Sequence, residues 1–510
     1  MKCFLALIFL FCISDNGYTQ TKKKNTGRPN IIFIMSDDHA YQAISAYGYG
    51  INHTPYIDAL AKEGVLFNRA FVNNSLCAPS RAAIITGKYS HLNGIMGNGT
   101  ERFDSSQTTF PKLLRQSGYQ TALIGKWHLN SEPTGFNYWN IFPGQGLYYN
   151  PDFIDSIGRK RVEGYATDLT TDYAIQWLDH RDTTKPFCIL VWNKAPHRDW
   201  LPPLKYLHEY DGKDIPVPAT FFDDYSTRTR AAHEQKMEIS KWLAPNYDLK
   251  ENLFITEPTE RLDENWINIF KRLNPDEQKA YGDAYTPKND SFKKANLEGK
   301  ELALWKYQRY VKDYLRCIQS VDDNVGRLTE WLKENNLDEN TIVIYTSDQG
   351  FYLGEHGWFD KRFMYEESFR TPLVIRWPAV IKPGSVNNKL VMNLDIPETL
   401  LEAAHVKIPD DMQGQSMLPL LNGKDTTLRK YVYYHYFEDG GEHNVAKHVG
   451  VRSDRYKLIY FYGNNEWELY DLKNDPSELH NIYNVPSYKK IQDDLKDELQ
   501  KQMKKYKDSI

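Results

Sequence analysis

The chain has little of three features that define whole classes of protein. Only 5 of its 510 residues are cysteine, and they are scattered, so no disulfide framework is expected. Basic residues are not in excess: 63 Lys and Arg against 67 Asp and Glu give a net charge of −4, which argues against a nucleic-acid partner. The apolar run Phe4–Ile13 is too short to span a bilayer, and no other run is long enough. We therefore expect no membrane span.

The short apolar run at the N-terminus is instead typical of an export signal. Lys2 supplies the positive end, Phe4–Ile13 the apolar centre, and cleavage is expected near Thr19-Gln20. A buried N-terminal strand is disfavoured because a polar stretch, residues 22–27, follows. The sequence thus predicts a signal peptide at residues 1–20 and a periplasmic or secreted mature protein.

The composition is that of a globular enzyme. Apolar residues make up 41% and charged residues 25% of a chain long enough for two unequal domains. Aromatic residues reach 14%. Such side chains stack on sugar rings, but they also fill large cores, and composition alone leaves both uses open.

Buried strands alternate with helices over most of the chain, which predicts an α/β fold with a large doubly wound mixed sheet flanked by helices. Expected strands are 30–36, 65–72, 120–124, 187–192, 341–345 and 373–377, and expected helices are 55–63, 77–87, 110–116, 170–180, 302–334 and 396–404. The helix after Cys77 is expected to be amphipathic. Residues 206–300 look irregular and are either an insertion beside the site or a solvated excursion.

The pattern changes near residue 429. Short strands of antiparallel type are expected at 432–434, 449–452, 456–460 and 468–470, and a Lys-rich amphipathic helix is expected from about Tyr488. We therefore expect a catalytic α/β domain at 28–428 and a smaller C-terminal subdomain, an antiparallel sheet with a helix, at 429–510.

Polar clusters follow four of the predicted strands directly. They are Asp37-Asp38, Lys126-Trp127-His128, Ala195-Pro196-His197 and Asp348-Gln349. Ligands of doubly wound sheets bind beyond the carboxyl ends of the strands. The four clusters are therefore expected to form one site.

The run Ser75-Leu76-Cys77-Ala78-Pro79-Ser80-Arg81 carries the most specific motif. Its Cys-x-Pro-Ser-Arg pattern resembles that of type I sulfatases, of the alkaline phosphatase superfamily, and the resemblance extends from Arg28 to Tyr483. It implies that a maturation enzyme oxidises Cys77 to Cα-formylglycine. A thiolate that attacked a sulfate ester would form a thiosulfate with no easy exit, whereas a hydrated aldehyde offers one hydroxyl to attack sulfur and another to eject sulfate.

The oxygen-bearing residues Asp37, Asp38, Asp348 and Gln349 suit a hard divalent ion such as calcium, and not zinc. The resemblance implies that they bind Ca²⁺, which also contacts the formylglycine at Cys77. Sulfatases more often have Asn where this chain has Gln349. The Gln side chain keeps the carbonyl oxygen on a longer arm.

A cationic shell is expected around the nucleophile. Arg81 follows Cys77 by one helical turn and can reach back toward the nucleophile and the metal ligands. The resemblance implies that Lys126 contacts sulfate and that His128 takes a proton from the formylglycine diol. It also implies that His197 and Lys361 flank the bridging oxygen, and His197 is the expected general acid.

Two stretches, 74–81 and 360–366, look most like N-acetylglucosamine-6-sulfatases and related glycan sulfatases. Asp360 and Arg362 flank Lys361 and are expected to hydrogen-bond a sugar hydroxyl, or else only to pair with each other. His443, on a Gly-rich loop, is a further candidate substrate contact. The resemblance implies a sulfated glycan substrate, with 6-O-sulfate of N-acetylglucosamine in glycosaminoglycan or mucin-type glycans as the expected target.

Other functions remain open at this point. The chain could act on another sulfated sugar position, or be a formylglycine-dependent phosphodiesterase or phosphonate hydrolase on the same fold. Comparing turnover of an aryl sulfate with that of an aryl phosphate diester would separate the last case. A non-catalytic glycan-binding protein is disfavoured because every expected catalytic position is filled.

Overall fold

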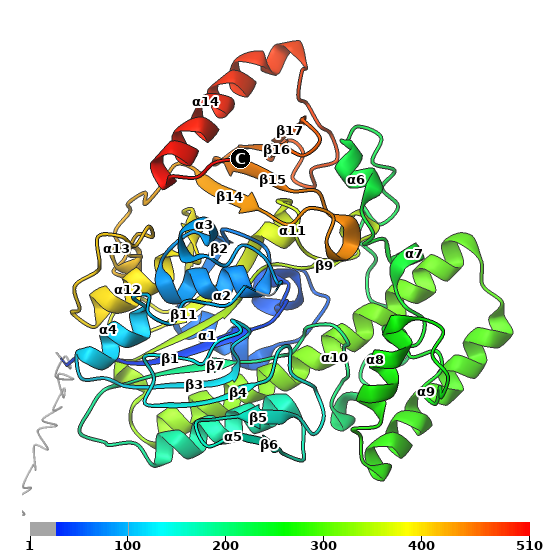
Figure 1. Cartoon of the computed structure of the whole chain (residues 1–510), viewed down its shortest axis with the longest axis horizontal. Helices are drawn as coiled ribbons and strands as arrows, with labels where there is room; N and C mark the ends of the chain where they lie inside the picture. The colour runs from blue at the N-terminus through cyan, green and yellow to red at the C-terminus, as the bar shows by residue number, and fades with distance from the viewer. Residues whose placement is uncertain (1–26, 100) are drawn as a thin grey trace, which may run out of the picture.

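The computed structural model describes residues 27–99 and 101–510 (Figure 1). The predicted signal peptide therefore lies outside the described residues. Within them, a large mixed sheet runs in the order β12-β2-β11-β8-β1-β7-β3-β4-β5-β6, with β13 paired to β2. Its strands are β1 (Asn30–Ser36), β2 (Val65–Phe71), β3 (Gln120–Lys126), β4 (Tyr138–Phe142), β5 (Asp152–Ile154), β6 (Arg159–Arg161), β7 (Phe187–Trp192), β8 (Thr341–Ser347), β11 (Arg370–Arg376), β12 (Ser385–Asn387) and β13 (Val391–Met392).

The centre of this sheet is parallel and buried on both faces. β1 pairs in parallel with β8 on one side and with β7 on the other, and β7 pairs in parallel with β3. Ile31 stands opposite Cys188 and Ile342. Parallel strands covered on both faces read as continuous apolar runs, which is why the sequence located β1 and β7 without error at either end.

Helices cover both faces, as the doubly wound prediction requires. Ile32 and Ile34 pack into one core with α1 (Pro55–Glu63), α5 (Ala166–Asp179) and α10 (Gly299–Glu334). The alternate residues Ile31, Phe33 and Met35 face the opposite core. That core includes α2 (Cys77–Thr86), α4 (Phe110–Gln116) and α12 (Asp395–Ala403). The predicted fold class is confirmed.

The expectation of an amphipathic α2 is wrong. All ten residues of the helix are buried, from Cys77 to Thr86. The helix lies between the large sheet and the C-terminal sheet (Figure 1), so no side of it is left for solvent. Small residues such as Ala82 and Ala83 permit this close packing.

The smaller sheet is antiparallel and has the order β14-β15-β16-β17. Its strands are β14 (Val432–Tyr436), β15 (His448–Arg452), β16 (Tyr456–Phe461) and β17 (Glu466–Asp471), and α14 (Lys489–Tyr506) covers it at the top of Figure 1. Leu495 and Leu499 of α14 share a core with Val449 and with Phe363 of the large domain. The domain boundary at 429 stays a prediction.

Residues 206–300 are not irregular throughout. They contain α6 (Arg230–Glu234), α7 (Ile239–Trp242), α8 (Arg261–Phe270) and α9 (Pro275–Ala295). α8 and α9 lie beside α10 (Figure 1), and Tyr281 and Tyr285 of α9 are buried in the core that α10 shares. Asn274 and Glu277 form a capping box that starts α9.

Shorter elements of the described chain include α3 (Ser90–Asn93), α11 (Glu366–Phe369), α13 (Leu418–Leu421) and the two-stranded ribbon of β9 (Tyr352–Leu353) and β10 (Phe359–Asp360). None of the helices in the described part of the chain combines the length and the apolar character that crossing a membrane requires.

Candidate active site

The four predicted polar clusters meet at one edge of the sheet. The strands that precede them, β8, β1, β7 and β3, are neighbours in this order, so their carboxyl ends lie side by side. The backbone N–H of Asp38 donates to Oδ1 of Asp348 at 3.1 Å, which joins the clusters after β1 and β8. The structure thus brings the four predicted clusters together at one edge of the sheet.

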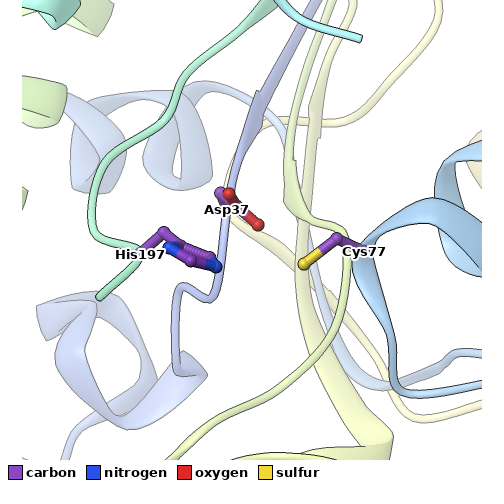
Figure 2. Close-up of side chains that lie close together, drawn as sticks. All are labelled: Asp37, Cys77 and His197. Carbon is purple, nitrogen blue, oxygen red and sulfur yellow. The ribbon is translucent and has the colours of Figure 1, made fainter. Parts of the chain in front are cut away.

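Cys77 is the first residue of α2, and its side chain points toward the polar clusters at this edge of the sheet. In Figure 2 its sulfur and the ring of His197 approach Asp37 from opposite sides, and the ligand-capable atoms of the three residues lie within 4.8 Å of one another. Lys361 Nζ lies 3.4 Å from the sulfur. Burial raises the pKa of the Cys77 thiol well above its ordinary value. Such a thiol is neutral near pH 7 and is a weak nucleophile.

The residues predicted to bind metal also converge. Carboxylate oxygens of Asp37, Asp38 and Asp348 lie within 4.8 Å of one another. Gln349 Nε2 donates to Asp38, while Gln349 Oε1 and Asp37 Oδ1 are buried and accept no hydrogen bond. Buried oxygens without donors are ready ligands for a hard cation. The residues present therefore fit calcium.

Burial raises the pKa of Asp38 to about 7 and that of Asp348 to about 6. Neighbouring carboxylates add to the effect, because like charges disfavour ionisation. A bound divalent cation would favour the ionised form of both groups. Asp38 and Asp348 are thus ionised only at a free-energy cost, which a bound divalent cation would offset.

Cationic side chains surround these carboxylates. Arg81 donates through Nε and NH2 to Oδ2 of Asp348, at 3.0 and 2.8 Å, and through NH1 to the carbonyl oxygen of Lys126 at 2.6 Å. Lys126 pairs with Asp37, and Lys361 pairs with Asp38. Arg81 therefore ties α2 to the ends of β8 and β3, and its Nε and NH2 both donate to a predicted metal ligand, Asp348.

Gln145 is a site residue that the sequence analysis missed. Its Oε1 accepts from Lys126 Nζ, and its Nε2 lies 3.2 Å from Nε2 of His128. The side chain thus holds Lys126 and His128 together. Burial lowers the pKa of the His128 imidazole, and Lys126 lowers it further. Gln145 follows β4, which is parallel to β3, so the strand-end argument could have found it.

The orientation of His197 leaves one nitrogen for the site. Nδ1 lies 2.6 Å from the carbonyl oxygen of Arg198, so Nδ1 carries a proton and donates it. Nε2 faces Asp38 Oδ2 at 3.8 Å. Burial lowers the pKa of this imidazole. An anion bound beside Nε2 would favour the imidazolium form, which can donate a proton from that nitrogen.

The three predicted substrate residues form one cluster beside Lys361. Arg362 pairs with Asp360, and His443 Nε2 lies 3.1 Å from Asp360 Oδ2. Nδ1 of His443 is 3.0 Å from the carbonyl oxygen of Lys236. Both ring nitrogens of His443 thus face oxygen atoms, one on Asp360 and one on the backbone. Asp360 and Arg362 do pair with each other. The pairing still leaves Nε of Arg362 without a hydrogen-bond partner.

Two further residues of this cluster were not predicted. Glu442 Oε2 accepts from Arg362 NH2 at 3.1 Å, and its Oε1 lies 3.7 Å from NH1 of Arg198. Lys236 belongs to the 206–300 segment, and its N–H donates to the carbonyl oxygen of His443 at 2.7 Å. The sequence analysis left open whether residues 206–300 lie beside the site or form a solvated excursion. The part that contains Lys236 lies beside the site.

Comparison with known proteins places these features in a family. The family model described as Sulfatase matches residues 29–406, and the model described as N-sulphoglucosamine sulphohydrolase, C-terminal, matches residues 354–505. An N-acetylglucosamine-6-O-sulfatase of Bacteroides thetaiotaomicron is 46% identical over 99% of this chain and 91% of its own length. An ulvan-active sulfatase of Formosa agariphila is 28% identical over 92% and 78%.

A solved structure is similar over nearly all of its length. It shows a protein in complex with its substrate D-glucosamine-2-N,6-O-disulfate, and it is 47% identical to this chain with a TM-score of 0.91. The match covers 94% of this chain and 98% of that one. The similarity spans both the large sheet and the C-terminal sheet.

Proposed function

Because the chain belongs to the sulfatase family and is a sulfuric ester hydrolase, we propose that it removes the 6-O-sulfate of N-acetylglucosamine at the non-reducing end of sulfated glycans, glycosaminoglycan or mucin-type. The observation that carries the proposal is the cluster of Asp360, Arg362 and His443 beside Lys361, where the sugar would begin. The relative from Bacteroides thetaiotaomicron bears the name of this activity, which supports the same assignment.

Sulfate ester cleavage needs a nucleophile, positive charge around the sulfuryl oxygens and a proton for the leaving alcohol. We assign the first to Cys77 converted to Cα-formylglycine, whose hydrated aldehyde supplies one hydroxyl for attack on sulfur and another for expulsion of sulfate. Calcium held by Asp37, Asp38, Cys77, Asp348 and Gln349 would supply Lewis acidity at the sulfuryl oxygens.

We assign the remaining roles to side chains of the same cluster. Lys126 and Lys361 bring positive charge to the carboxylate cluster from two sides, where sulfate oxygens would lie. His128 accepts the proton of the diol, held in position by Gln145. His197 presents Nε2 to the bridging oxygen and gives it a proton as the sugar leaves. Arg81 holds Asp348 in place.

Export and maturation are part of the same proposal. The predicted signal peptide at residues 1–20 would direct the protein to the periplasm or outside the cell. A formylglycine-generating enzyme would have to oxidise Cys77 before the protein can hydrolyse sulfate esters. Peptide mass analysis of the mature protein tests both points, because it reads the first residue of the chain and the state of residue 77.

Substitution of Asp360 tests the substrate assignment. Asp360→Ala is expected to lower kcat/KM for 6-sulfated N-acetylglucosamine by about 10–150-fold, the usual value of a hydrogen bond to a charged group, and to spare small aryl sulfates. Asp439→Ala, on the same loop as His443 but with a side chain 58% exposed, is the matched control and should change neither rate. The assignment is wrong if 6-sulfated galactose is hydrolysed as fast, or if only 2-O-, 3-O- or N-sulfate is removed.

Metal removal gives a second test. Chelation is expected to abolish turnover and to lower the melting temperature, and calcium should restore both, since a ligand at 100 times its Kd stabilises the native state by about 2.7 kcal/mol. Asp348→Asn keeps the size of the side chain but removes a charge, so the calcium-dependent shift in melting temperature should be lost. Zinc as the native metal by elemental analysis, or an unchanged shift in Asp348→Asn, would contradict the site.

A further inference from the structure

A cavity of about 670 Å³ lies on the side of α10 that faces away from the catalytic residues. On the catalytic side, Tyr314 donates to the carbonyl oxygen of Asp38 at 2.6 Å. Arg309, Lys312 and Arg316 project from another side of the helix, at i, i+3 and i+7, and line the cavity. The opposite wall is the loop 211–217, which comes from the 206–300 segment.

The charges of this cavity are not balanced. Asp211 is shared by Lys288 and Arg316, at 2.7 and 2.8 Å. Asp214 is 92% exposed and lies 3.7 Å from Lys312. Within the described part of the chain, no carboxylate lies within ion-pair distance of the remaining cation, Arg309. Asp313 and Glu251 act on Arg309 without forming an ion pair, so the positive charges of Arg309 and Lys312 are only weakly compensated.

Arg309 is held in position without its full set of partners. Its side chain is buried, with the residue only 7% exposed, and NH2 donates to Asn289 Oδ1 at 2.8 Å. NH1 has no hydrogen-bond partner. The guanidinium packs against the rings of Tyr285 and Trp305, at 5.2 and 5.3 Å. Burial lowers the pKa of Arg309, as expected for a cation whose charged form is poorly compensated.

A buried guanidinium with one nitrogen that lacks a hydrogen-bond partner is destabilising unless a ligand supplies that partner. The planar fork of arginine matches the oxygens of sulfate and of carboxylate. The cavity is far larger than a bare oxyanion needs and has the volume typical of small-molecule sites. Its apolar wall, from Ile215, Val217, Leu304 and Trp305, suits the face of a sugar ring.

The wall is also preformed. Gln308 accepts from the N–H of Ile215 at 2.9 Å and donates to the carbonyl oxygen of the same residue at 2.7 Å, which fixes the loop to α10. We propose that this cavity is a second glycan site, which binds a sulfated sugar unit with Arg309 and Lys312 on the sulfate and Trp305 beside the ring. The site is separate from the catalytic pocket and does not require the proposed function to be correct.

Calorimetric titration of two full-length variants tests the proposal. Cys77→Ala is the parent, so that the probe, a disaccharide ending in 6-sulfated N-acetylglucosamine, is not hydrolysed. Arg309→Met in this parent is expected to bind one ligand fewer per chain, and its melting temperature without ligand should be equal or higher, because a weakly compensated buried charge has been removed. Lys294→Met, an exposed charge on α9 outside the cavity, should bind as the parent does.

Lys312→Met in the same parent is the second probe of the site and should weaken the second binding event at least 10-fold. Unchanged stoichiometry and affinity in both cavity variants would overturn the proposal. A lower melting temperature in Arg309→Met with binding unaltered would assign Arg309 to the fold alone. Inorganic sulfate is titrated separately: if it binds as tightly as the disaccharide, the site takes the free anion and the glycan assignment is wrong.

Discussion

Replacing Cys77 by alanine is expected to abolish sulfate ester hydrolysis, with a loss on the order of 10⁶-fold, as when the nucleophile of a well-organised site is removed. The serine variant is expected to be equally inactive, because a single hydroxyl cannot both attack sulfur and later expel the sulfate. Turnover of an aryl sulfate measures the loss. Cys77 is fully buried in a helix, where alanine is well tolerated, so the melting temperature should change little.

The mass of the peptide that contains residue 77 completes this test. Active protein should show loss of sulfur and gain of oxygen at that residue. Full activity in a preparation whose Cys77 is wholly a free thiol would rule out the formylglycine assignment. The raised pKa of the buried thiol already makes a thiolate nucleophile unfavourable.

His197→Ala should slow the release of poor leaving groups most. A sugar alcohol needs a proton to leave, and general-acid catalysis is typically worth about 10²–10⁴-fold, whereas nitrophenol leaves without that help. The variant should therefore lose far more activity on a sulfated sugar than on nitrophenyl sulfate. Rates on the two substrates, measured with the same preparation, give the ratio.

His180, exposed at the end of α5, provides the matched control: His180→Ala should leave both rates unchanged. Equal losses on both substrates in His197→Ala would assign His197 to sulfate binding and not to proton donation. The hydrogen bond from Nδ1 to the carbonyl oxygen of Arg198 leaves Nε2 as the nitrogen that faces the site. We therefore expect the larger loss of activity on the sulfated sugar.

The sequence located the buried parallel strands well and the polar helices poorly. β1 and β7 are short apolar runs with polar residues at each end, a pattern that burial on both faces imposes. α9 has no such pattern. Its composition is polar, and Pro287 lies inside it. The helix is stabilised by the packing of its buried side chains Tyr281 and Tyr285 in the core that α10 shares. Tertiary packing of this kind leaves little trace in local propensity.

The same distinction separates the site residues that could be predicted from the sequence from those that could not. Residues that follow parallel strands at once or within a few positions, such as Asp37 and His197, could be placed because the topology of the sheet brings strand ends together. Glu442 could not, since its contacts with Arg362 and Arg198 join segments far apart in the chain. No periodicity or spacing reports such a contact. The roles given to all these side chains stay predictions until the variants are measured.

The burial of the motif around Cys77 has a consequence for timing during biosynthesis. Ser75, Cys77, Ser80 and Arg81 are fully enclosed, and α2 lies beneath the C-terminal sheet, whose residue Tyr434 accepts the N–H of Ser75. Another protein cannot touch the sulfur once this sheet has docked. The maturation enzyme that we propose would therefore have to act on the nascent or unfolded chain, and a chain that folded first would keep the thiol.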